Sequence, residues 1–554
     1  MEQSDCYYLG FDLGTQQLKC VLTDSNLAVR HVVAINYDLA LPMFRTSGGV
    51  HINGDEVTAP VLMWIKALEL ALDDLKHSNF DLSKVIALSG AAQQHGSVYW
   101  KPGAEEALAN LNSNSSLADQ LKDCFATSDS PVWMDNSTQE ECNELEAAVG
   151  GALSLAKLTG SAAHLRFTGP QLLKKCRKET AIYNATERIS LVSSFLCSLF
   201  LGRYAPIDFS DGSGMNLLNL KTHTWAAECL KVFPADLCEK LGPCVPSTDC
   251  LDSISPYFVK RYGFSSKCRV VVFTGDNPCM NFTYCYYFYF QAARFGFIEG
   301  WASLAGLNQR PSDLSISLGT SDTVFVWMNN AIPISNGHIF CNPVDPSMYM
   351  GLLCFRNGDC TRKQARRRLC GGNATWSQFE HLVDSSPPGN CGVFYEYEEI
   401  GSKVLPQYIL VNADGCRVPF FEKQIEARAV VEHQCLAKRL SSYKTGMRSK
   451  MERILVTGGA SNSEIILQTL SDVFNLPVYR KDVAHSAALG GAVRAKHALV
   501  MLEYGSFVPL DFESSPGKLV AEPRQSVVEI YEEMIIKYAD FVERLESASC
   551  SDLL

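Results

Sequence analysis

Two short stretches of the chain place a Gly-Thr turn between two apolar runs. The first is LGFDLGTQQLKCVLT at residues 9–23, and the second is LSISLGTSDTVFVWM at residues 314–328. Such a turn presents backbone N–H groups and a hydroxyl, which together bind anions such as phosphate. Asp12 stands beside the first turn, where it could hold Mg²⁺ through water, because that ion keeps much of its hydration shell. The pair favours a phosphate site over two ordinary hairpins, and its residues would be Gly14, Thr15, Gly319 and Thr320.

A third candidate is Gly275-Asp276-Asn277, which follows the apolar run at residues 269–274. A carboxylate there would lie at the C-terminal edge of a sheet, where open α/β sheets bind ligands. It could accept the proton of a hydroxyl group that attacks a phosphoryl group. An Asx-turn cap is the alternative interpretation of this tripeptide.

Four further residues are weaker candidates. His95 follows Gln93-Gln94 and could donate to a hydroxyl-rich ligand, although a lone histidine is more often structural. Arg166 would by default be a surface arginine. Gly459 and Ala460 precede a predicted helix and permit the close approach of a flat ring. The sequence contains no GxxxxGK[ST] and no GxGxxG after a strand, so the nucleotide folds that use them lack support.

Short apolar runs alternate with amphipathic stretches along the chain, which implies layered α/β structure. Predicted strands lie at 7–13, 18–22, 85–89, 269–274, 314–318, 324–328 and 454–457, and predicted helices at 55–75, 137–149, 463–473 and 526–546. A capping box of Ser137 and Glu140 is expected to start the second helix. The basic run at 362–368 is expected to be a solvated surface. Two Gly-Thr turns of the same design suggest two similar α/β halves that face each other.

Composition excludes several classes of protein. The 554 residues include 49 basic and 60 acidic side chains, a net charge of -11, which argues against a nucleic-acid binder. The 21 cysteines contain no C-x-x-C pair, and no secretory signal is visible, so we expect reduced thiols in a cytoplasmic protein. No apolar run is long enough to cross a membrane.

Nine motifs in order resemble those of the FGGY carbohydrate kinases. They are FDLGT (11–15), GAAQQHGSVYW (90–100), PVWMDNST (131–138), RFTG (166–169), DFSDGSGMNLL (208–218), FTGDNP (273–278), SISLGTSDT (315–323), ILVTGGAS (454–461) and AALGGA (487–492). The resemblance implies two actin-like (ribonuclease H-like) α/β domains of related topology that face each other across a cleft. It implies a sugar-binding domain at 1–275, a nucleotide-binding domain at 276–510, and a C-terminal helix and tail at 511–554.

The same resemblance implies transfer of the γ-phosphate of ATP to D-xylulose, with Mg²⁺. Asp276 matches the family's catalytic base, and His95, Arg166, Asp276 and Asn277 match its sugar-binding positions. Trp376 matches a position near the adenine, Gly459 and Ala460 match the adenosine turn, and the last adenosine contact is Asn462 or Ser463. The protein would be a monomer or a homodimer, with a sugar and ATP as its partners. Another ketose or a polyol is the alternative substrate.

The chain departs from the family pattern immediately after Asp276. Residues 279–301, CMNFTYCYYFYFQAARFGFIEGW, separate GDNP from ASLAG, and ten of these 23 residues are aromatic. Three interpretations stay open: a segment absent from the mature chain, an insertion that packs outside the cleft, or an insertion that blocks catalysis and leaves a non-catalytic binding protein. An apolar, β-prone run without proline is an aggregation hazard where it is exposed.

Overall fold

The computed structural model describes residues 6–276, 312–319, 322–333, 337–343, 345–355, 358–389, 394–398, 407–411, 419, 421–446, 451–480, 486–505 and 517–547. The chain divides into two compact units. Unit 1 comprises Met1–Arg310, Trp327–Met350 and Val483–Ser515, and unit 2 comprises Pro311–Val326, Gly351–Asp482 and Pro516–Leu554. Asn277, Thr320 and the segment 279–301 lie outside the described residues. The predicted domain boundary between 275 and 276 stays a prediction.

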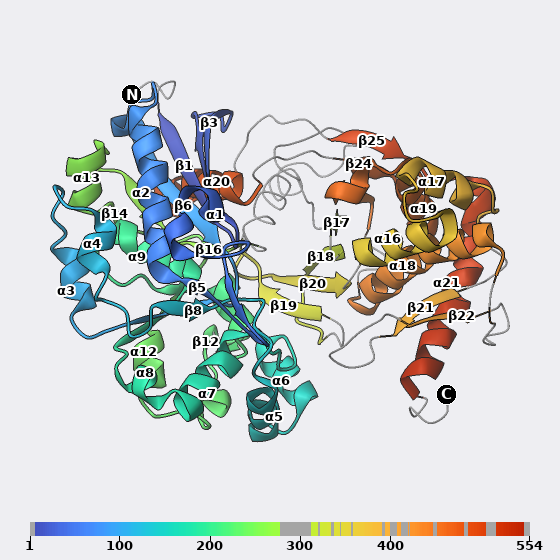
Figure 1. Ribbon diagram of the computed structural model, residues 1–554, viewed down its shortest axis with the longest axis horizontal. Coiled ribbons are helices and arrows are strands. Elements are labelled where there is room, and N and C mark those ends of the chain that lie inside the picture. The colour runs from blue at the N-terminus through green and yellow to red at the C-terminus, as the bar shows by residue number, and fades with distance from the viewer. Residues whose placement is uncertain are drawn as a thin grey trace. The chain divides into compact units, whose positions relative to one another are not determined.

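Unit 1 is built on a mixed sheet with the strand order β14-β15-β6-β1-β2-β3 (Figure 1). Its strands are β1 (Tyr7–Leu13), β2 (Gln17–Thr23), β3 (Val29–Asn36), β6 (Val85–Ala92), β14 (Cys250–Ser253) and β15 (Arg269–Val271). β1 and β2 form an antiparallel hairpin around the Gly-Thr turn, and β1 pairs in parallel with β6. β16 (Thr274–Gly275) continues beside β6.

Unit 2 repeats this arrangement with the strand order β20-β18-β17-β23-β24-β25. Its strands are β17 (Asp313–Leu318), β18 (Asp322–Met328), β20 (Tyr349–Phe355), β23 (Arg453–Thr457), β24 (Val478–Arg480) and β25 (Lys518–Ala521). β17 and β18 form an antiparallel hairpin, β17 pairs in parallel with β23, and an antiparallel strand closes the far edge. The prediction of two similar α/β halves from the two Gly-Thr turns is therefore confirmed at the level of topology.

Helices cover both faces of the unit 1 sheet. Alternate residues of β1 pack against α2 (Val61–His77) and α9 (Val192–Leu201), and the opposite face carries α20 (Ser486–Tyr504). Glycines allow α20 to lie directly on the strands: a Cβ atom at Gly10 would stand 1.9 Å from the Ala488 carbonyl oxygen, and one at Gly491 would stand 2.9 Å from that of Ser89. The small residues of the AALGGA motif therefore serve helix–sheet contact.

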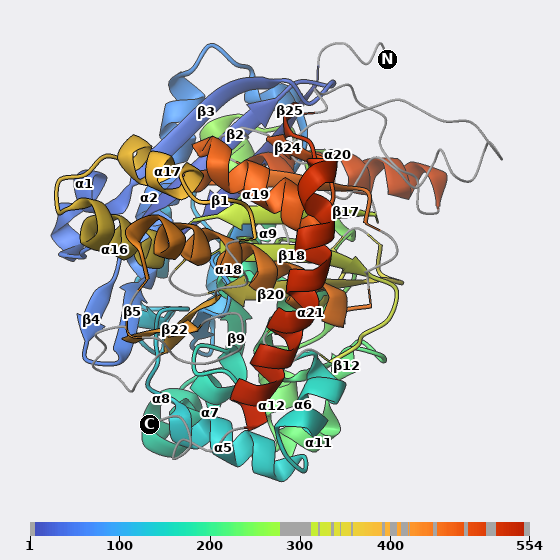
Figure 2. The ribbon, with the colours of Figure 1, turned by 90° about the vertical axis from the view of Figure 1, so that its right-hand side faces the viewer.

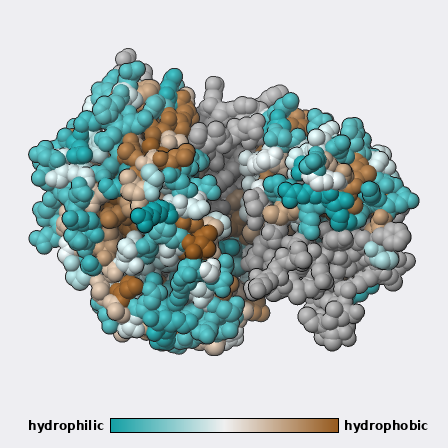
Figure 3. Space-filling view, viewed as in Figure 1, coloured by the Kyte–Doolittle hydropathy of each residue, from teal (hydrophilic) through white to brown (hydrophobic). Residues whose placement is uncertain are grey.

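Long helices pack together in unit 2. α18 (Lys423–Lys444) and α19 (Glu464–Phe474) both contact α21 (Gln525–Ser547), which crosses them in Figure 2. The predicted helices at 463–473 and 526–546 are confirmed. None of the helices in the described ranges is long and apolar enough to span a bilayer. On the face shown in Figure 3, hydrophilic residues cover most of the described surface between small apolar patches.

Three local predictions are wrong. Residues 55–75 are not one helix: β5 (Glu56–Pro60) pairs with two other strands, and α2 begins only after Pro60. The N-cap of α5 (Gln139–Ala148) is Thr138 and not Ser137, and it makes no side-chain capping bond: its hydroxyl donates to the Leu165 carbonyl, and the Ser137 hydroxyl donates to Asp135. The basic run is part of α16 (Gly358–Cys370), and it is not wholly solvated, since Arg362 is buried against Asp322 at 2.9 Å.

Replacing Gly10 with alanine tests the contact between α20 and the sheet. The new methyl group would overlap the backbone of Ala488 and Ala492, which cannot move aside as a side chain end does. We expect Gly10→Ala to lower the free energy of unfolding by about 3 kcal/mol or more, measured by chemical denaturation. Gly372→Ala is the matched control, because nothing lies within 4 Å of its added Cβ. Equal stability of the two variants would contradict the packing described.

Candidate active site

Three chain segments of unit 1 reach the same edge of its sheet. Asp12 of β1 is level with Ala91 of β6, and Gly275 of β16 is level with Ala92. Asp276 follows β16 directly and is partly exposed, whereas Gln93 and Gln94 follow β6 and are buried. The strand register therefore places the carboxylates predicted for metal binding and for base catalysis at the same edge of the sheet.

Asp12 and the Gly-Thr turn form one side of this edge. Burial raises the pKa of Asp12 to about 6, and the charge of Lys19 partly opposes the rise. The Gly14 N–H donates to the Gln17 carbonyl at 3.1 Å, so the turn itself uses this donor. The Thr15 hydroxyl accepts from the Trp133 indole N–H at 2.8 Å and lies 3.5 Å from Gln93 Oε1. The turn is thus held in place by two side chains that sequence reasoning left without a role.

His95 occupies a buried position with a left-handed backbone, at φ 70°. Its ring stacks on Phe167 at 4.3 Å, and its Nδ1 lies 3.0 Å from the Gly214 carbonyl oxygen. A carbonyl only accepts, so Nδ1 carries the proton and the neutral ring leaves Nε2 as an acceptor. Burial, followed by the charge of Arg166, lowers the pKa of His95 well below its usual range. The neutral imidazole thus accepts at Nε2, whereas the sequence suggested that it donates.

Arg166 is held by His338, a residue that the sequence did not single out. Arg166 Nη2 lies 3.3 Å from His338 Nε2, and His338 Nδ1 lies 3.2 Å from the Ser161 hydroxyl. Because a guanidinium only donates, His338 Nε2 accepts and Nδ1 donates to Ser161. The predicted sugar-binding residues His95 and Arg166 are joined through Phe167, whose ring contacts both histidines. These four residues, His95, Arg166, Phe167 and His338, all belong to unit 1.

The residues predicted to bind adenosine come together in unit 2. Trp376 begins α17 (Trp376–Asp384) and is 37% exposed, with the Arg366 guanidinium 4.7 Å from its ring centre. Glu380 lies one helical turn further on the same face and accepts a hydrogen bond from the Ser463 hydroxyl. This bond ties α17 to the turn η6 (Gly459–Asn462).

The glycine turn leaves open space above it. Gly458 has φ 91°, and a Cβ atom there would stand 2.5 Å from the Leu318 carbonyl oxygen, so glycine is required. Gly459 is exposed, and a Cβ atom added to it would have no neighbour within 4 Å. Asn462 is the last residue of the turn, and its Oδ1 accepts from the Arg480 guanidinium at 3.3 Å. Ser463 follows directly, so both candidates for the last adenosine contact lie at the turn. Gly319, at the end of β17, is partly exposed.

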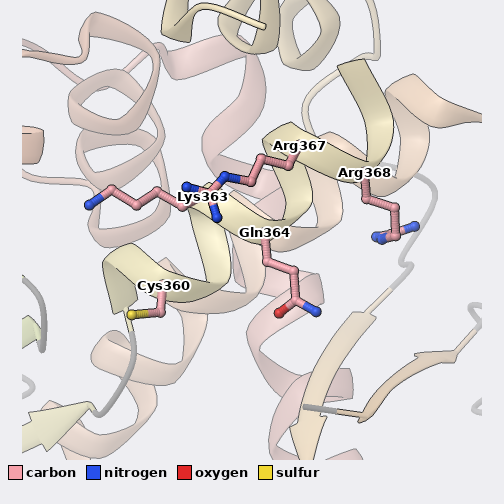
Figure 4. Close-up of a pocket in the computed structure, with 5 residues that line it drawn as sticks. All are labelled: Cys360, Lys363, Gln364, Arg367 and Arg368. Atoms are coloured by element: carbon pink, nitrogen blue, oxygen red, sulfur yellow. The ribbon is translucent and has the colours of Figure 1, made fainter. Parts of the chain in front are cut away.

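A separate cavity of about 440 Å³ lies on α16. Figure 4 shows the side chains that line it, namely Cys360, Lys363, Gln364, Arg367 and Arg368. Neighbouring carboxylates neutralise part of its charge: Lys363 pairs with Asp359, and Arg368 pairs with Glu426. No residue predicted to bind ATP or sugar lines it.

Comparison with known proteins decides the family. Residues 128–283 match the N-terminal domain of the FGGY family of carbohydrate kinases, and residues 314–499 match its C-terminal domain. The chain is 45% identical to a xylulose kinase of Rattus norvegicus over 545 residues, 97% of each chain. It is 42% identical to xylulose kinase 2 of Arabidopsis thaliana, over 91% of this chain and 89% of that one. The chain belongs to the FGGY family of carbohydrate kinases.

Solved structures of a xylulose kinase and a glycerol kinase share the fold. A ligand-bound xylulose kinase from Lactobacillus acidophilus superposes with a TM-score of 0.72 at 18% identity, over 98% of this chain and 99% of that one. A glycerol kinase from Plasmodium falciparum gives a TM-score of 0.70 at 14% identity, over 98% of both chains. The predictions of the two-domain α/β kinase fold and of an ATP-dependent sugar kinase are confirmed. Residues 284–313, which include most of the segment 279–301, lie between the two family matches.

Several residues that contact the candidate site or its neighbours escape prediction from the sequence. His338, Glu380, Asp208 and Asp211 are distant in sequence from the residues that they contact. Asp208 and Asp211 do lie within a quoted motif, DFSDGSGMNLL, and their spacing of three residues could have marked them as a pair.

The neutral state of His95 predicts a pH dependence of stability. In the folded protein the pKa of His95 is lowered, whereas in the unfolded chain this histidine protonates near pH 6.5. Because the unfolded state then binds the extra proton, the free energy of unfolding falls as pH falls below that value. Between pH 6.5 and 5.5 we expect the free energy of unfolding to fall more steeply in wild type than in His95→Gln, by up to about 1.4 kcal/mol per pH unit. Urea unfolding at each pH measures both slopes. Equal pH dependence of the two proteins would contradict a buried neutral imidazole.

Proposed function

We propose that this FGGY kinase transfers the γ-phosphate of ATP to D-xylulose, with Asp276 as the general base. The observation that carries the proposal is the position of Asp276, at the end of β16 and level with the residues that follow β6. The carboxylate lies at the carboxyl edge of a parallel strand pair, where α/β sheets present their ligand-binding groups. The names of the relatives, which are 42–45% identical, support the choice of D-xylulose.

In this mechanism, Asp276 accepts the proton of a sugar hydroxyl as its oxygen attacks the γ-phosphorus and ADP leaves. His95, Arg166 and Asn277 would hold the sugar. Since a ketose carries no charge, selection depends on matched hydrogen bonds, and a missing hydroxyl would leave a buried polar group unpaired. The neutral His95 suits this role, because its Nε2 can accept from a hydroxyl without placing a charge beside the substrate.

ATP would be held by both Gly-Thr turns and by the unit 2 turn. Gly14, Thr15, Gly319 and Thr320 would receive the phosphates, and Trp376, Gly459, Ala460 and Ser463 would surround the adenosine. Asp12 would hold Mg²⁺ through water, and the ion would neutralise phosphate charge when bound. Among the described residues, no three acidic, histidine or cysteine side chains form a metal cluster. A single carboxylate fits Mg²⁺, which typically combines one or two carboxylates with water and substrate phosphates.

The segment 279–301 gives a second candidate function, a sugar- or nucleotide-binding protein without phosphoryl transfer. Its support is that residues 284–313 lie outside both family matches. Assays of the full chain and of a variant lacking 279–301 separate the two functions. Calorimetric binding of ATP and D-xylulose without any ADP formation by either protein would favour the binding protein.

The substrate and the base are tested by ADP release with D-xylulose, D-ribulose, D-fructose, L-fuculose and glycerol. We expect the highest kcat/KM with D-xylulose. Asp276→Asn keeps the shape of the side chain but cannot take a proton, so kcat should fall by about 10²–10⁴-fold. Asp252→Asn is the control, because its carboxylate lies on the surface beside Arg203. Normal turnover by Asp276→Asn would refute the base, and a clear preference for another acceptor would refute the substrate.

Trp376 tests the adenosine position. Base–aromatic stacking contributes about 1–3 kcal/mol, so Trp376→Ala should raise the KM for ATP about tenfold while the KM for sugar stays constant. Trp376→Phe retains a stacking ring and should lie close to wild type. Steady-state kinetics with each substrate varied in turn measure both constants. An unchanged KM for ATP in Trp376→Ala would remove this residue from the nucleotide site.

A further inference from the structure

The backbone immediately before Asp276 passes directly over two buried side chains. A Cβ atom at Gly275 would stand 2.4 Å from Cγ of Gln94 and 2.7 Å from Oδ1 of Asp211. Gln94 and Asp211 are each 2% exposed. Glycine is therefore needed at 275 because these two side chains fill the space beneath it, and any shift of either would press on the residue that precedes the base.

Hydrogen bonds fix this support from two sides. Gln94 Nε2 donates to Asp211 Oδ1 at 3.2 Å, and the Ser193 hydroxyl of α9 donates to Asp211 Oδ2. One residue earlier in β16, the Thr274 hydroxyl donates to Asp208 Oδ2 at 2.9 Å. Both residues before Asp276 thus rest on a buried carboxyl group.

The two carboxyl groups are themselves held by one short helix. Asp208 caps α10 (Phe209–Gly212), where it accepts from the backbone N–H groups of Ser210 and Asp211. The Ser247 hydroxyl also donates to Asp208, and Arg494 of α20 supplies a nearby positive charge. The network therefore connects β16 to α9, α10 and α20, all within unit 1.

The protonation state of the two buried carboxyl groups also affects Asp276. Burial raises the pKa of both Asp208 and Asp211, and for Asp211 the neighbouring charges of Asp208 and then Asp276 add to the rise. A proton retained on Asp211 keeps a second negative charge away from Asp276. When Asp211 is protonated at Oδ2, its hydrogen bond with Ser193 reverses direction, because Oδ2–H then donates to the Ser193 oxygen, while Oδ1 still accepts from Gln94.

We propose that Asp208 and Asp211 are positioning residues, which fix the backbone at Thr274 and Gly275 and so aim Asp276 at the hydroxyl of the acceptor. The inference rests on the proposed function, since it takes Asp276 as the base. Neither carboxyl group is assigned contact with sugar or ATP. Their loss should therefore lower kcat and leave both KM values nearly unchanged, because a displaced base costs rate without costing binding.

The alternative is that the network only stabilises the fold, which any buried polar cluster can do. Two substitutions separate the roles with little change in volume. Asp211→Asn keeps an acceptor for Gln94 and gains a donor for Ser193, as a protonated carboxyl group would present. Thr274→Val removes only the hydroxyl that donates to Asp208.

The experiment measures kcat and both KM values for wild type, Asp211→Ala, Asp211→Asn and Thr274→Val, below their unfolding temperatures. We expect kcat to fall about 100-fold in Asp211→Ala, to stay within about fivefold of wild type in Asp211→Asn, and to fall about tenfold in Thr274→Val, with every KM within about threefold. Glu141→Ala is the matched control, because Glu141 is a buried unit 1 carboxylate that pairs with Lys178. It should lower the unfolding temperature and leave kcat unchanged.

Two results overturn the positioning role. One is a Thr274→Val enzyme with wild-type kcat, which decides the matter even if Asp211→Ala does not fold. The other is an Asp211→Asn enzyme as slow as Asp211→Ala. Failure of the proposed function has a different signature: wild type transfers no phosphate to any acceptor, or Asp276→Asn is as fast as wild type. If Asp276→Asn is inactive and either of those first two results is obtained, only the positioning role fails.

Discussion

The parallel pairing of β6 with β1 on one side and with β16 on the other is the constraint on which the site depends. It sets Asp12 level with Ala91 and Gly275 level with Ala92. The polar side chains of residues 12, 93–95 and 276 therefore lie at the same edge of the sheet. A slip of one residue in either pair would turn each side chain to the opposite face of the sheet. The register is in turn protected by close packing: Gly491 of α20 lies directly on Gly10 of β1, where no side chain fits between helix and strand.

The two units share a strand pattern but differ in the residues that follow equivalent strands. In unit 1, β6, which pairs in parallel with β1, leads into Gln93-Gln94-His95, a buried polar stretch suited to a hydroxylated ligand. In unit 2 the equivalent strand, β23, leads into Gly458-Gly459-Ala460, where open space lies beside Gly459. One scaffold therefore presents polar side chains in one copy and an open glycine turn in the other, as the sugar and the adenine that we propose as their ligands would require.

Much of the fold could be predicted from the sequence, because strands and turns leave local patterns. The Gly-Thr repeat predicts two related sheets, and the apolar run before Asp276 predicts its place at a sheet edge. Predictions failed where tertiary contacts override local patterns. Val57 has helical spacing to later residues, yet it lies in β5, which pairs with strands on both sides and ends at Pro60. Arg362 belongs to a basic run, but it is buried, where Asp322 compensates its charge.

The parts of the site that escaped prediction are those whose role depends on another residue. His338 orients Arg166 from a strand 172 positions later in the chain, and its hydrogen-bond role follows only from what each partner can donate or accept. Asp211 has the same character, since nothing in DFSDGS shows that its oxygen lies beneath Gly275. Residues that touch a ligand must have particular chemistry and can be recognised by type. Residues that support the ligand-binding residues act through their position, and that position can be read only from the folded structure.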